Sequence, residues 1–296
     1  MDFTLAHGTA NDFIVVPDLE DRYELPVALV RALCDRRQGI GADGVLRIAP
    51  GEAGAGIFMD HRNADGSSPE MCGNGIRVVA KYVLDRGLAT PDDHGVVHIA
   101  TRAGVKAVTA RRGDDGRVSE VTVDMGAPVL APAEVPFETD DAAAVVQTVD
   151  LDDGRRIPIG VVSMGNPHGV LRVDDVGTAP VGDLGPLLES HARFPAKANI
   201  GFARVLDTTS IDLRVWERGV GETAACGTGA CAAVVALQRQ ELLGPEVQVH
   251  LPGGTLTIRH ELGGTVHMTG PAVEVATGHI DTDWLAHADR DHIDPR

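Results

Sequence analysis

The sequence predicts an α+β fold of two pseudo-symmetric lobes, each a mostly antiparallel curved sheet wrapped around a central buried helix. Two similar segments predict the central helices. Cys72 opens an apolar run to Leu84 through Cys-Gly-Asn-Gly, and Cys226 opens another to Leu237 through Cys-Gly-Thr-Gly. Such runs are typical of buried helices, whereas the surrounding segments alternate apolar and polar residues as strands do.

The two cysteines lie about 154 positions apart, and other residues repeat at nearly the same period. Asn11 in NDF precedes Asn166 in GNPH by about 155 positions, and Asn63 precedes Glu217 by about 154. The length of 296 residues allows about two domains of roughly 150 residues each. A duplicated half-chain explains the motif, the period and the length together.

The first lobe is predicted to begin with strands at 3–6 and 14–16, separated by the turn HGTANDF. Pro26 suits the first position of the helix that follows. Val27, Val30, Leu33 and Cys34 recur at helical spacing, so Cys34 is expected in the core. The glycine-rich GIGADG ends that helix, and VLRI and GIFMD are predicted strands.

The helix after Cys72 carries its only charged residues on one stripe. Arg77, Lys81 and Asp85 are spaced at i, i+4 and i+8, so we expect one solvent-exposed edge on this helix. The helix after Cys226 has almost no polar residue, and Cys231 is expected in its core.

The remaining segments predict strands and a domain join. Residues 96–125 alternate apolar and polar side chains between glycine turns. Residues 128–150 are rich in proline, alanine and acidic residues, which indicates the join. After the second helix, EVQVHL, TLTIRH and TVHMTG predict a meander. We expect an N-terminal lobe of residues 1–126, to which residues 275–296 return, and a C-terminal lobe of residues 127–274.

Composition excludes some functions. The net charge of −17 indicates a solvated acidic surface and argues against general nucleic-acid binding, which needs a basic face. The N-terminus lacks a basic stretch followed by an apolar run, and no apolar stretch is long enough to cross a bilayer. Four cysteines do not make a disulfide framework in a chain of this length. A cytoplasmic location, where thiols stay reduced, is therefore expected.

The cysteines at the helix starts suggest acid–base chemistry. The positive end of a helix favours a thiolate, and the following glycines let backbone N–H groups approach an anion closely. A substrate carboxylate could bind the N–H groups of Gly73 and Asn74 in one lobe and of Gly227 and Thr228 in the other. Two opposed thiols could then remove a proton from one face of a carbon and deliver one to the other face, inverting it. No residue spacing indicates a metal or another cofactor.

These motifs resemble the diaminopimelate epimerase family over nearly the whole chain. The matching motifs are NDF at Asn11, NADGS at Asn63, MCGNGIR around Cys72, GNPH at Asn166, KANIGF at Asn199 and ERGVGETAACGTGA around Cys226. The resemblance implies a PLP-independent isomerase that interconverts L,L- and meso-diaminopimelate without a cofactor, for lysine and peptidoglycan precursor synthesis.

The resemblance also implies roles for individual residues. In the L,L-to-meso direction it makes Cys226 the proton acceptor and Cys72 the proton donor, and the roles exchange in reverse. It pairs His168 with Cys72 and Glu217 with Cys226 as assisting groups. The further substrate contacts that it implies are Asn11, Asn63, Asn166, Asn199, Glu217 and Arg218. Amides, a carboxylate and a guanidinium suit an amino-acid zwitterion.

One position departs from the family pattern. Some members have a glutamine contact where this chain has Gly44, so only a backbone contact with substrate is expected there. The resemblance also implies a homodimer.

Two alternatives remain open from the sequence. A proline racemase-like enzyme of the same architecture would also use two cysteines, but it would not be expected to carry Asn63, Asn199 and Arg218 together. A non-catalytic small-molecule binding protein would bind ligand without exchanging its α-proton. A dinucleotide site is disfavoured, because CGxG lacks the context of a strand, GxGxxG and a helix.

Overall fold

The computed structural model describes residues 1–51 and 54–288 and confirms the α+β class. Strands dominate, and the described helices are α1 (Val27–Cys34), α2 (Gly73–Asp85), α3 (Val181–Glu189), α4 (Gly227–Gln238) and α5 (Thr282–Ala288). The chain forms two compact units: unit 1 is Met1–Val123 with the described chain from Gly270 on, and unit 2 is Asp124–Thr269. Residues 289–296, part of the segment expected to return to the first lobe, lie outside the described residues.

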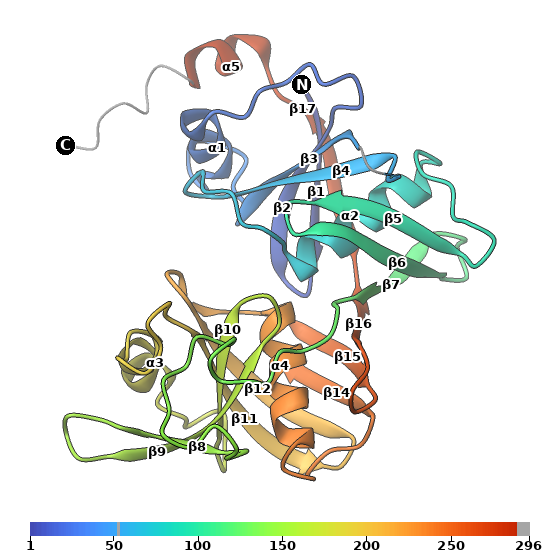
Figure 1. Cartoon of the computed structure of the whole chain (residues 1–296). Coiled ribbons are helices and arrows are strands. Elements are labelled where there is room, and N and C mark those ends of the chain that lie inside the picture. Colours follow the sequence, from blue (N-terminus) through green and yellow to red (C-terminus); the bar gives the residue numbers. More distant parts are fainter. Residues whose placement is uncertain (52–53, 289–296) are drawn as a thin grey trace. The chain divides into compact units, whose positions relative to one another are not determined.

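Unit 1 is a sheet folded around α2 (Figure 1). Its strands are β1 (Asp2–Gly8), β2 (Asn11–Pro17), β3 (Gly44–Pro50), β4 (Ile57–Asn63), β5 (Val96–Thr101), β6 (Gly104–Arg112), β7 (Val118–Asp124) and β17 (Val273–His279). Neighbouring pairs are antiparallel except β2–β3 and β4–β5, which are parallel. Strand β17 pairs with β1, and α2 contacts β1 to β6.

Unit 2 repeats this order of pairings. Its strands are β8 (Gln147–Asp150), β9 (Arg156–Ser163), β10 (Pro167–Arg172), β11 (Asn199–Asp207), β12 (Ser210–Glu217), β13 (Gly221–Thr223), β14 (Glu246–Leu251), β15 (Gly254–His260) and β16 (Val266–Pro271). The pairs β10–β11 and β12–β14 are parallel, and β9–β10, β11–β12 and β14–β15 are antiparallel. This succession agrees with the repeat found in the sequence.

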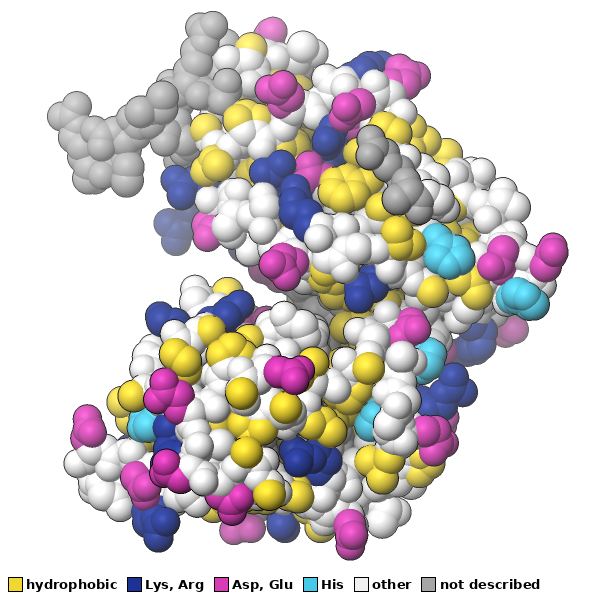
Figure 2. Space-filling model, viewed as in Figure 1, with side chains coloured by type: hydrophobic (Ala, Val, Ile, Leu, Met, Phe, Trp, Pro, Cys, Tyr) yellow, Lys and Arg dark blue, Asp and Glu magenta, His cyan; other side chains and the backbone are white. Residues whose placement is uncertain are grey.

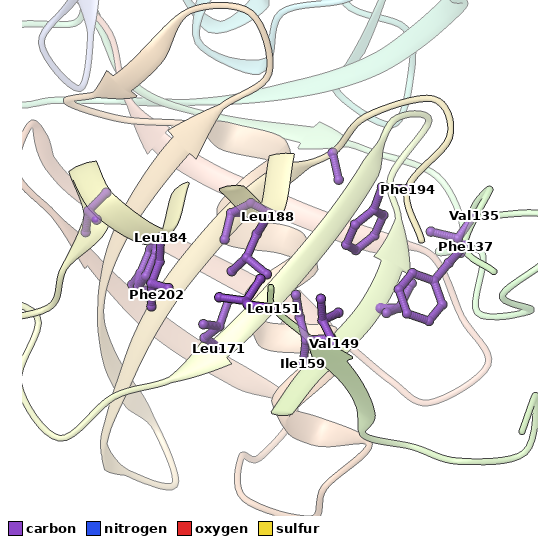
Figure 3. Packing of buried hydrophobic residues seen from close by; sticks show 14 residues of the cluster. Val135, Phe137, Val149, Leu151, Ile159, Leu171, Leu184, Leu188, Phe194 and Phe202 are labelled. Carbon is purple, nitrogen blue, oxygen red and sulfur yellow. The ribbon is translucent and has the colours of Figure 1, made fainter. Parts of the chain in front are cut away.

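Apolar side chains fill the space between helix and sheet in both units. In unit 2, α3 packs on β12 and β11, and a buried cluster runs from Leu184 and Leu188 to Phe202 (Figure 3). The rings of Phe137 and Phe194 close one end, with centroids 4.8 Å apart. In unit 1 a second cluster joins α1 and α5 to the first strands. Burial of such side chains is the main favourable contribution to folding.

One expectation about exposure is wrong. The charged stripe of α2 is not a wet edge: Arg77 is fully buried and Lys81 is buried. Lys81 donates to Asp85 Oδ2 and to the carbonyl of Val118. A carboxylate on α2 itself and a carbonyl of β7 thus replace water around Lys81.

The predicted burial of α4, Cys34 and Cys231 is confirmed. Helix α4 is buried along almost its whole length, and Cys34 and Cys231 are core residues. Acidic, basic and apolar side chains are interspersed on the visible face of each unit (Figure 2). Among the described helices, none combines the length and apolarity that a membrane span requires.

Candidate active site

The first group of predicted site residues lies at one edge of the unit 1 sheet. Asn11 begins β2, Gly44 begins β3 and Asn63 ends β4. Because β2 and β3 are parallel and β4 is antiparallel to β3, these strand ends coincide: Gly44 is opposite Phe13 on one side and opposite Asn63 on the other. The repeated strand order therefore gathers residues that are far apart in sequence.

Cys72 is the N-cap of α2. Its backbone is extended, and its Sγ accepts a hydrogen bond from the Gly75 N–H at 3.3 Å. The thiol lies 4.0 Å from Asn11 Oδ1, which also accepts from Asn74 Nδ2 at 3.3 Å. Asn11 Nδ2 donates in turn to Asp43 Oδ2 at 2.9 Å. Hydrogen bonds at both its oxygen and its nitrogen thus fix the orientation of the Asn11 amide beside the thiol.

Gly44 has no room for a side chain. A Cβ built there would lie 2.6 Å from the carbonyl oxygen of Arg62 and 3.2 Å from His61 Nε2. Glycine is therefore required for the close pairing of β3 with β4. Asn63, opposite Gly44, donates from Nδ2 to Ser67 Oγ at 2.9 Å.

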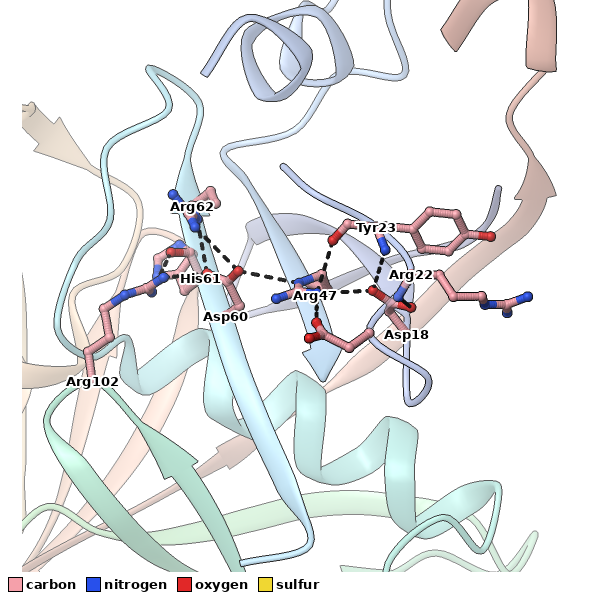
Figure 4. Close-up of polar contacts among 9 residues, drawn as sticks. Asp18, Arg22, Tyr23, Arg47, Asp60, His61, Arg62 and Arg102 are labelled. Atoms are coloured by element: carbon pink, nitrogen blue, oxygen red, sulfur yellow. Dashed lines mark hydrogen bonds and ion pairs between the residues drawn. The ribbon is translucent and has the colours of Figure 1, made fainter. Parts of the chain in front are cut away.

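A buried ion-pair network supports β4 just before Asn63 (Figure 4). Asp60, whose side chain is 4% exposed, accepts hydrogen bonds from Arg62, Arg102 and Arg47. Arg47 also pairs with the buried Asp18. Burial opposes ionisation of Asp60, but the hydrogen bonds from Arg62 and Arg102 outweigh it and hold its pKa below the ordinary value.

The second group lies at the matching edge of unit 2. Asn166 immediately precedes β10 and His168 is its second residue, while Asn199 begins β11 and Glu217 ends β12. His168 is opposite Asn199 in the parallel pair. Cys226 is the N-cap of α4, and its Sγ accepts from the Gly229 N–H at 3.4 Å.

The surroundings of Cys226 favour the neutral thiol. Burial raises its pKa well above the ordinary value, and the Glu217 carboxylate raises it further by repulsion and by accepting a hydrogen bond. Bonds from the Thr228 hydroxyl, 3.5 Å from Sγ, and from the Gly229 N–H act in the opposite direction but are weaker. Glu217 is itself held by the hydroxyl of Thr223.

His168 is a buried, neutral imidazole. Burial, followed by repulsion from Arg218, lowers its pKa to about 3. Its Nε2 lies 3.0 Å from Asn166 Oδ1, and Asn166 Nδ2 is 3.5 Å from the Thr228 hydroxyl at the start of α4. Asn166 therefore links His168 to the turn that follows Cys226.

Arg218 and Asn199 hold each other in place. The Arg218 N–H donates to Asn199 Oδ1 at 2.8 Å, and Asn199 Nδ2 donates to the Pro167 carbonyl. The Arg218 guanidinium donates to the Ala196 carbonyl at 2.9 Å. Within the described residues, no group of three or more His, Cys, Asp or Glu side chains is arranged to hold a metal ion.

Several residues that hydrogen-bond to the predicted site residues were not identified from the sequence. Thr9, Asp43 and Thr223 hold predicted site residues, and Arg77 was expected in solvent. The sequence signal for Arg77 was its place in MCGNGIR, five residues after Cys72.

Sequence comparison places the chain beside one family. The family model described as diaminopimelate epimerase matches residues 3–131 and 160–275. A diaminopimelate epimerase from Acidovorax ebreus is 48% identical over 94% of this chain and 97% of its own length. Another, from Acetivibrio thermocellus, is 43% identical over 96% of this chain and 100% of its own length.

Structure comparison finds the same architecture at low sequence identity. A probable proline racemase from Agrobacterium radiobacter K84 has a TM-score of 0.69 at 16% identity, covering 97% of this chain and 95% of that protein. A hydroxyproline epimerase from Agrobacterium vitis has a TM-score of 0.68 at 15% identity, covering 94% and 91%. These likenesses establish the fold alone.

Proposed function

Because the chain belongs to the diaminopimelate epimerase family, we propose that it interconverts L,L- and meso-diaminopimelate without a cofactor, using Cys72 and Cys226 as its two acid–base groups. One observation carries the proposal. Each thiol caps a buried helix at the same place in a repeated strand order, with the N–H of its third helical residue on the sulfur. The first N–H groups of an α-helix have no acceptor within the helix, so they are suited to a substrate carboxylate.

The reaction exchanges one proton for another at a single α-carbon. In the L,L-to-meso direction the Cys226 thiolate removes the α-proton, and the Cys72 thiol delivers its proton to the opposite face. The enzyme then holds a Cys226 thiol and a Cys72 thiolate, which is the form that catalyses the reverse reaction. Negative charge that develops on the substrate is stabilised by the N–H groups of Gly73, Asn74, Gly227 and Thr228 around its carboxylate.

Glu217 supplies a route to the Cys226 thiolate. Burial and the Glu217 charge favour the Cys226 thiol in the chain without substrate. The same carboxylate accepts a hydrogen bond from the thiol, so it is placed to take the proton when substrate binds.

The other predicted residues bind and orient substrate in this proposal. Asn11, Asn63, Asn166, Asn199 and Arg218 supply amide and guanidinium groups, and Gly44 supplies backbone only. His168 assists Cys72 as a neutral imidazole, because its pKa of about 3 keeps it uncharged at neutral pH.

The biological setting follows from the family. We propose that the enzyme serves lysine and peptidoglycan precursor synthesis in the cytoplasm, since all four cysteines are free thiols and two of them must stay reduced. A homodimer is proposed on the same resemblance, and light scattering after size exclusion would measure its mass.

The test is incubation of the dialysed protein with L,L-diaminopimelate in D₂O. We expect meso product with deuterium at the inverted α-carbon, measured by mass spectrometry and NMR. Cys72→Ala and Cys226→Ala should each lower kcat/KM by about 10³-fold or more, since each removes one of two required proton carriers.

Circular dichroism serves as the folding control for both variants. Turnover of proline in place of diaminopimelate would support a proline racemase instead. Bound diaminopimelate that never gains deuterium would indicate a binding protein, and near-normal turnover by either variant would rule out the two-thiol mechanism.

A further inference from the structure

Arg77 is the largest fully buried side chain described in the chain, and its position is tied to the proposed site. It lies on α2 five residues after Cys72. We propose that Arg77 and Thr9 are positioning residues that hold the β1–β2 turn against α2 and so place the Asn11 amide for substrate. This inference rests on the proposed function, because it assigns Asn11 a substrate to bind.

The guanidinium joins three segments of unit 1. Nη1 donates to the Gly73 carbonyl at 3.1 Å, in the first turn of α2. Nη2 donates to Thr9 Oγ1 at 3.0 Å, in the turn between β1 and β2. Nε donates to the Pro271 carbonyl at 3.3 Å, in the segment that returns to unit 1. Arg77 therefore fixes the start of α2 relative to the turn.

A line of hydrogen bonds continues from Arg77 to Asn11. Thr9 Oγ1, which accepts from Arg77, donates to Asn74 Oδ1 at 3.3 Å. Asn74 Nδ2 donates to Asn11 Oδ1 at 3.3 Å, the same oxygen that lies 4.0 Å from Cys72 Sγ. The orientation of the Asn74 amide, and with it that of Asn11, thus depends on the Thr9 hydroxyl.

The backbone of the β1–β2 turn adopts a conformation that non-glycine residues keep only with support from their side-chain contacts. Thr9 and Ala10 have φ of 51° and 60°, as the two central residues of a tight hairpin require, although neither is a glycine. A β-branched residue in the left-handed region is strained and persists only where its surroundings hold it. Here the Thr9 hydroxyl, bonded on both sides, supplies that hold.

Gly8 lets the turn approach the helix. A Cβ at Gly8 would lie 3.0 Å from Arg77 Nη2 and 3.0 Å from the Asn74 carbonyl oxygen. Turn and helix therefore meet directly, without an intervening side chain at this position. The contact is specific to unit 1, because the position equivalent to Arg77 in α4 is Cys231.

The test compares Thr9→Val with Thr9→Ser in the full-length enzyme. Valine keeps the shape and β-branching of threonine but lacks the hydroxyl, whereas serine keeps the hydroxyl. We expect Thr9→Val to raise KM for L,L-diaminopimelate about tenfold with a smaller change in kcat, the equivalent of one lost binding hydrogen bond. Thr9→Ser should stay within about twofold of the parent protein.

Thr101→Val is the matched control. Thr101 is buried in unit 1 and donates its hydroxyl to the Gly104 carbonyl at 2.7 Å, away from Asn11. It should lower Tm but leave KM unchanged. Parent-like kinetics for Thr9→Val, a Thr9→Ser variant as impaired as Thr9→Val, or an equal rise of KM in Thr101→Val would each overturn the proposal.

Hydrogen exchange gives a second readout that needs no substrate. Amides of residues 8–12 should exchange faster in Thr9→Val than in Thr9→Ser or Thr101→Val, and equal exchange in all three would overturn the positioning role. If the parent protein does not epimerise diaminopimelate, the proposed function fails, while the exchange comparison still decides whether the Thr9 hydroxyl holds the turn.

Discussion

The starts of α2 and α4 are built alike but surrounded differently. Both begin with a cysteine N-cap whose sulfur accepts an N–H bond, at 3.3 Å for Cys72 and 3.4 Å for Cys226. Cys72 lies beside the Asn11 amide, whereas Cys226 lies beside the Glu217 carboxylate. The repeat thus preserves the backbone geometry of the thiols, while side chains at equivalent places give the two thiols different neighbours.

Equivalent positions elsewhere in the repeat follow the same rule. Glu217 corresponds to Asn63, which binds Ser67 and carries no charge. His168 corresponds to Phe13, whose ring packs on the edge of His61, with centroids 5.5 Å apart. The Glu217 carboxylate, which acts on Cys226, therefore has a neutral amide at its equivalent position in unit 1. This difference suits two thiols that must begin each turnover in different protonation states.

Of the three substitutions proposed here, replacement of Glu217 should have the largest effect, because it removes the carboxylate that distinguishes the surroundings of Cys226 from those of Cys72. Glu217→Gln should lower kcat by about 10²- to 10⁴-fold, since it removes the carboxylate proposed to take the proton from the Cys226 thiol. It should also lower the pKa of Cys226, because the charge that raises it is gone, although burial still keeps that pKa above the ordinary value. The rate of Cys226 alkylation as a function of pH, followed by peptide mass spectrometry, measures the shift.

Asn63→Gln is the control, because it places the same glutamine side chain at the equivalent position of unit 1. It should leave the Cys226 titration unchanged. An unchanged Cys226 titration in Glu217→Gln would show that the carboxylate does not act on the thiol.

The Asp60 network tests how far unit 1 depends on buried charge. Asp60→Asn should lower the free energy of unfolding by about 3 kcal/mol at neutral pH, because the three partly exposed arginines lose the buried carboxylate that accepts their hydrogen bonds. The folded pKa of Asp60 is depressed, so its contribution is complete above the ordinary value of about 3.9 and is lost as the pH falls through the folded pKa.

Denaturant unfolding of both proteins at several pH values measures this loss. The difference between them should narrow as the pH falls below about 4. Asp153→Asn, at an exposed ion pair in unit 2, is the control and should leave the free energy of unfolding nearly unchanged. A difference that stays constant down to strongly acidic pH would contradict the assignment to Asp60 ionisation.

Substitution of Gly44 should have the smallest of the three effects, and it acts on stability. The equivalent position in unit 2 is Asn199, a full side chain. Gly44→Ala should lower the free energy of unfolding by about 1–3 kcal/mol, because its Cβ would lie 2.6 Å from the Arg62 carbonyl oxygen. Gly56→Ala is the matched control, since a Cβ there meets nothing within 4 Å. Equal stability of the two variants, measured by thermal unfolding, would show that β3 and β4 can move apart to accommodate the Cβ without a loss of folding free energy.

Much of the fold could be predicted because its signals are local. The apolar run after each cysteine, the alternation in β5 to β7 and β14 to β16, and the glycine turns each lie within a few neighbouring residues. The candidate site could be located because the repeat period places Cys72 and Cys226 equivalently. The direction of the Cys226 pKa shift could not be derived from that repeat, because it depends on burial and on the Glu217 carboxylate beside the sulfur.

The sequence by itself determined the α+β class, the duplicated order of elements and the two cysteines that open the buried helices. Only the tertiary structure decided that Arg77 lies inside the protein and that Thr9 connects it to Asn11. The charged spacing of α2 looked like a solvent-facing stripe, yet the bond from Arg77 to Pro271 spans 194 positions. Partners so distant leave no trace in local periodicity, because only folding brings their carbonyl and hydroxyl groups to the helix.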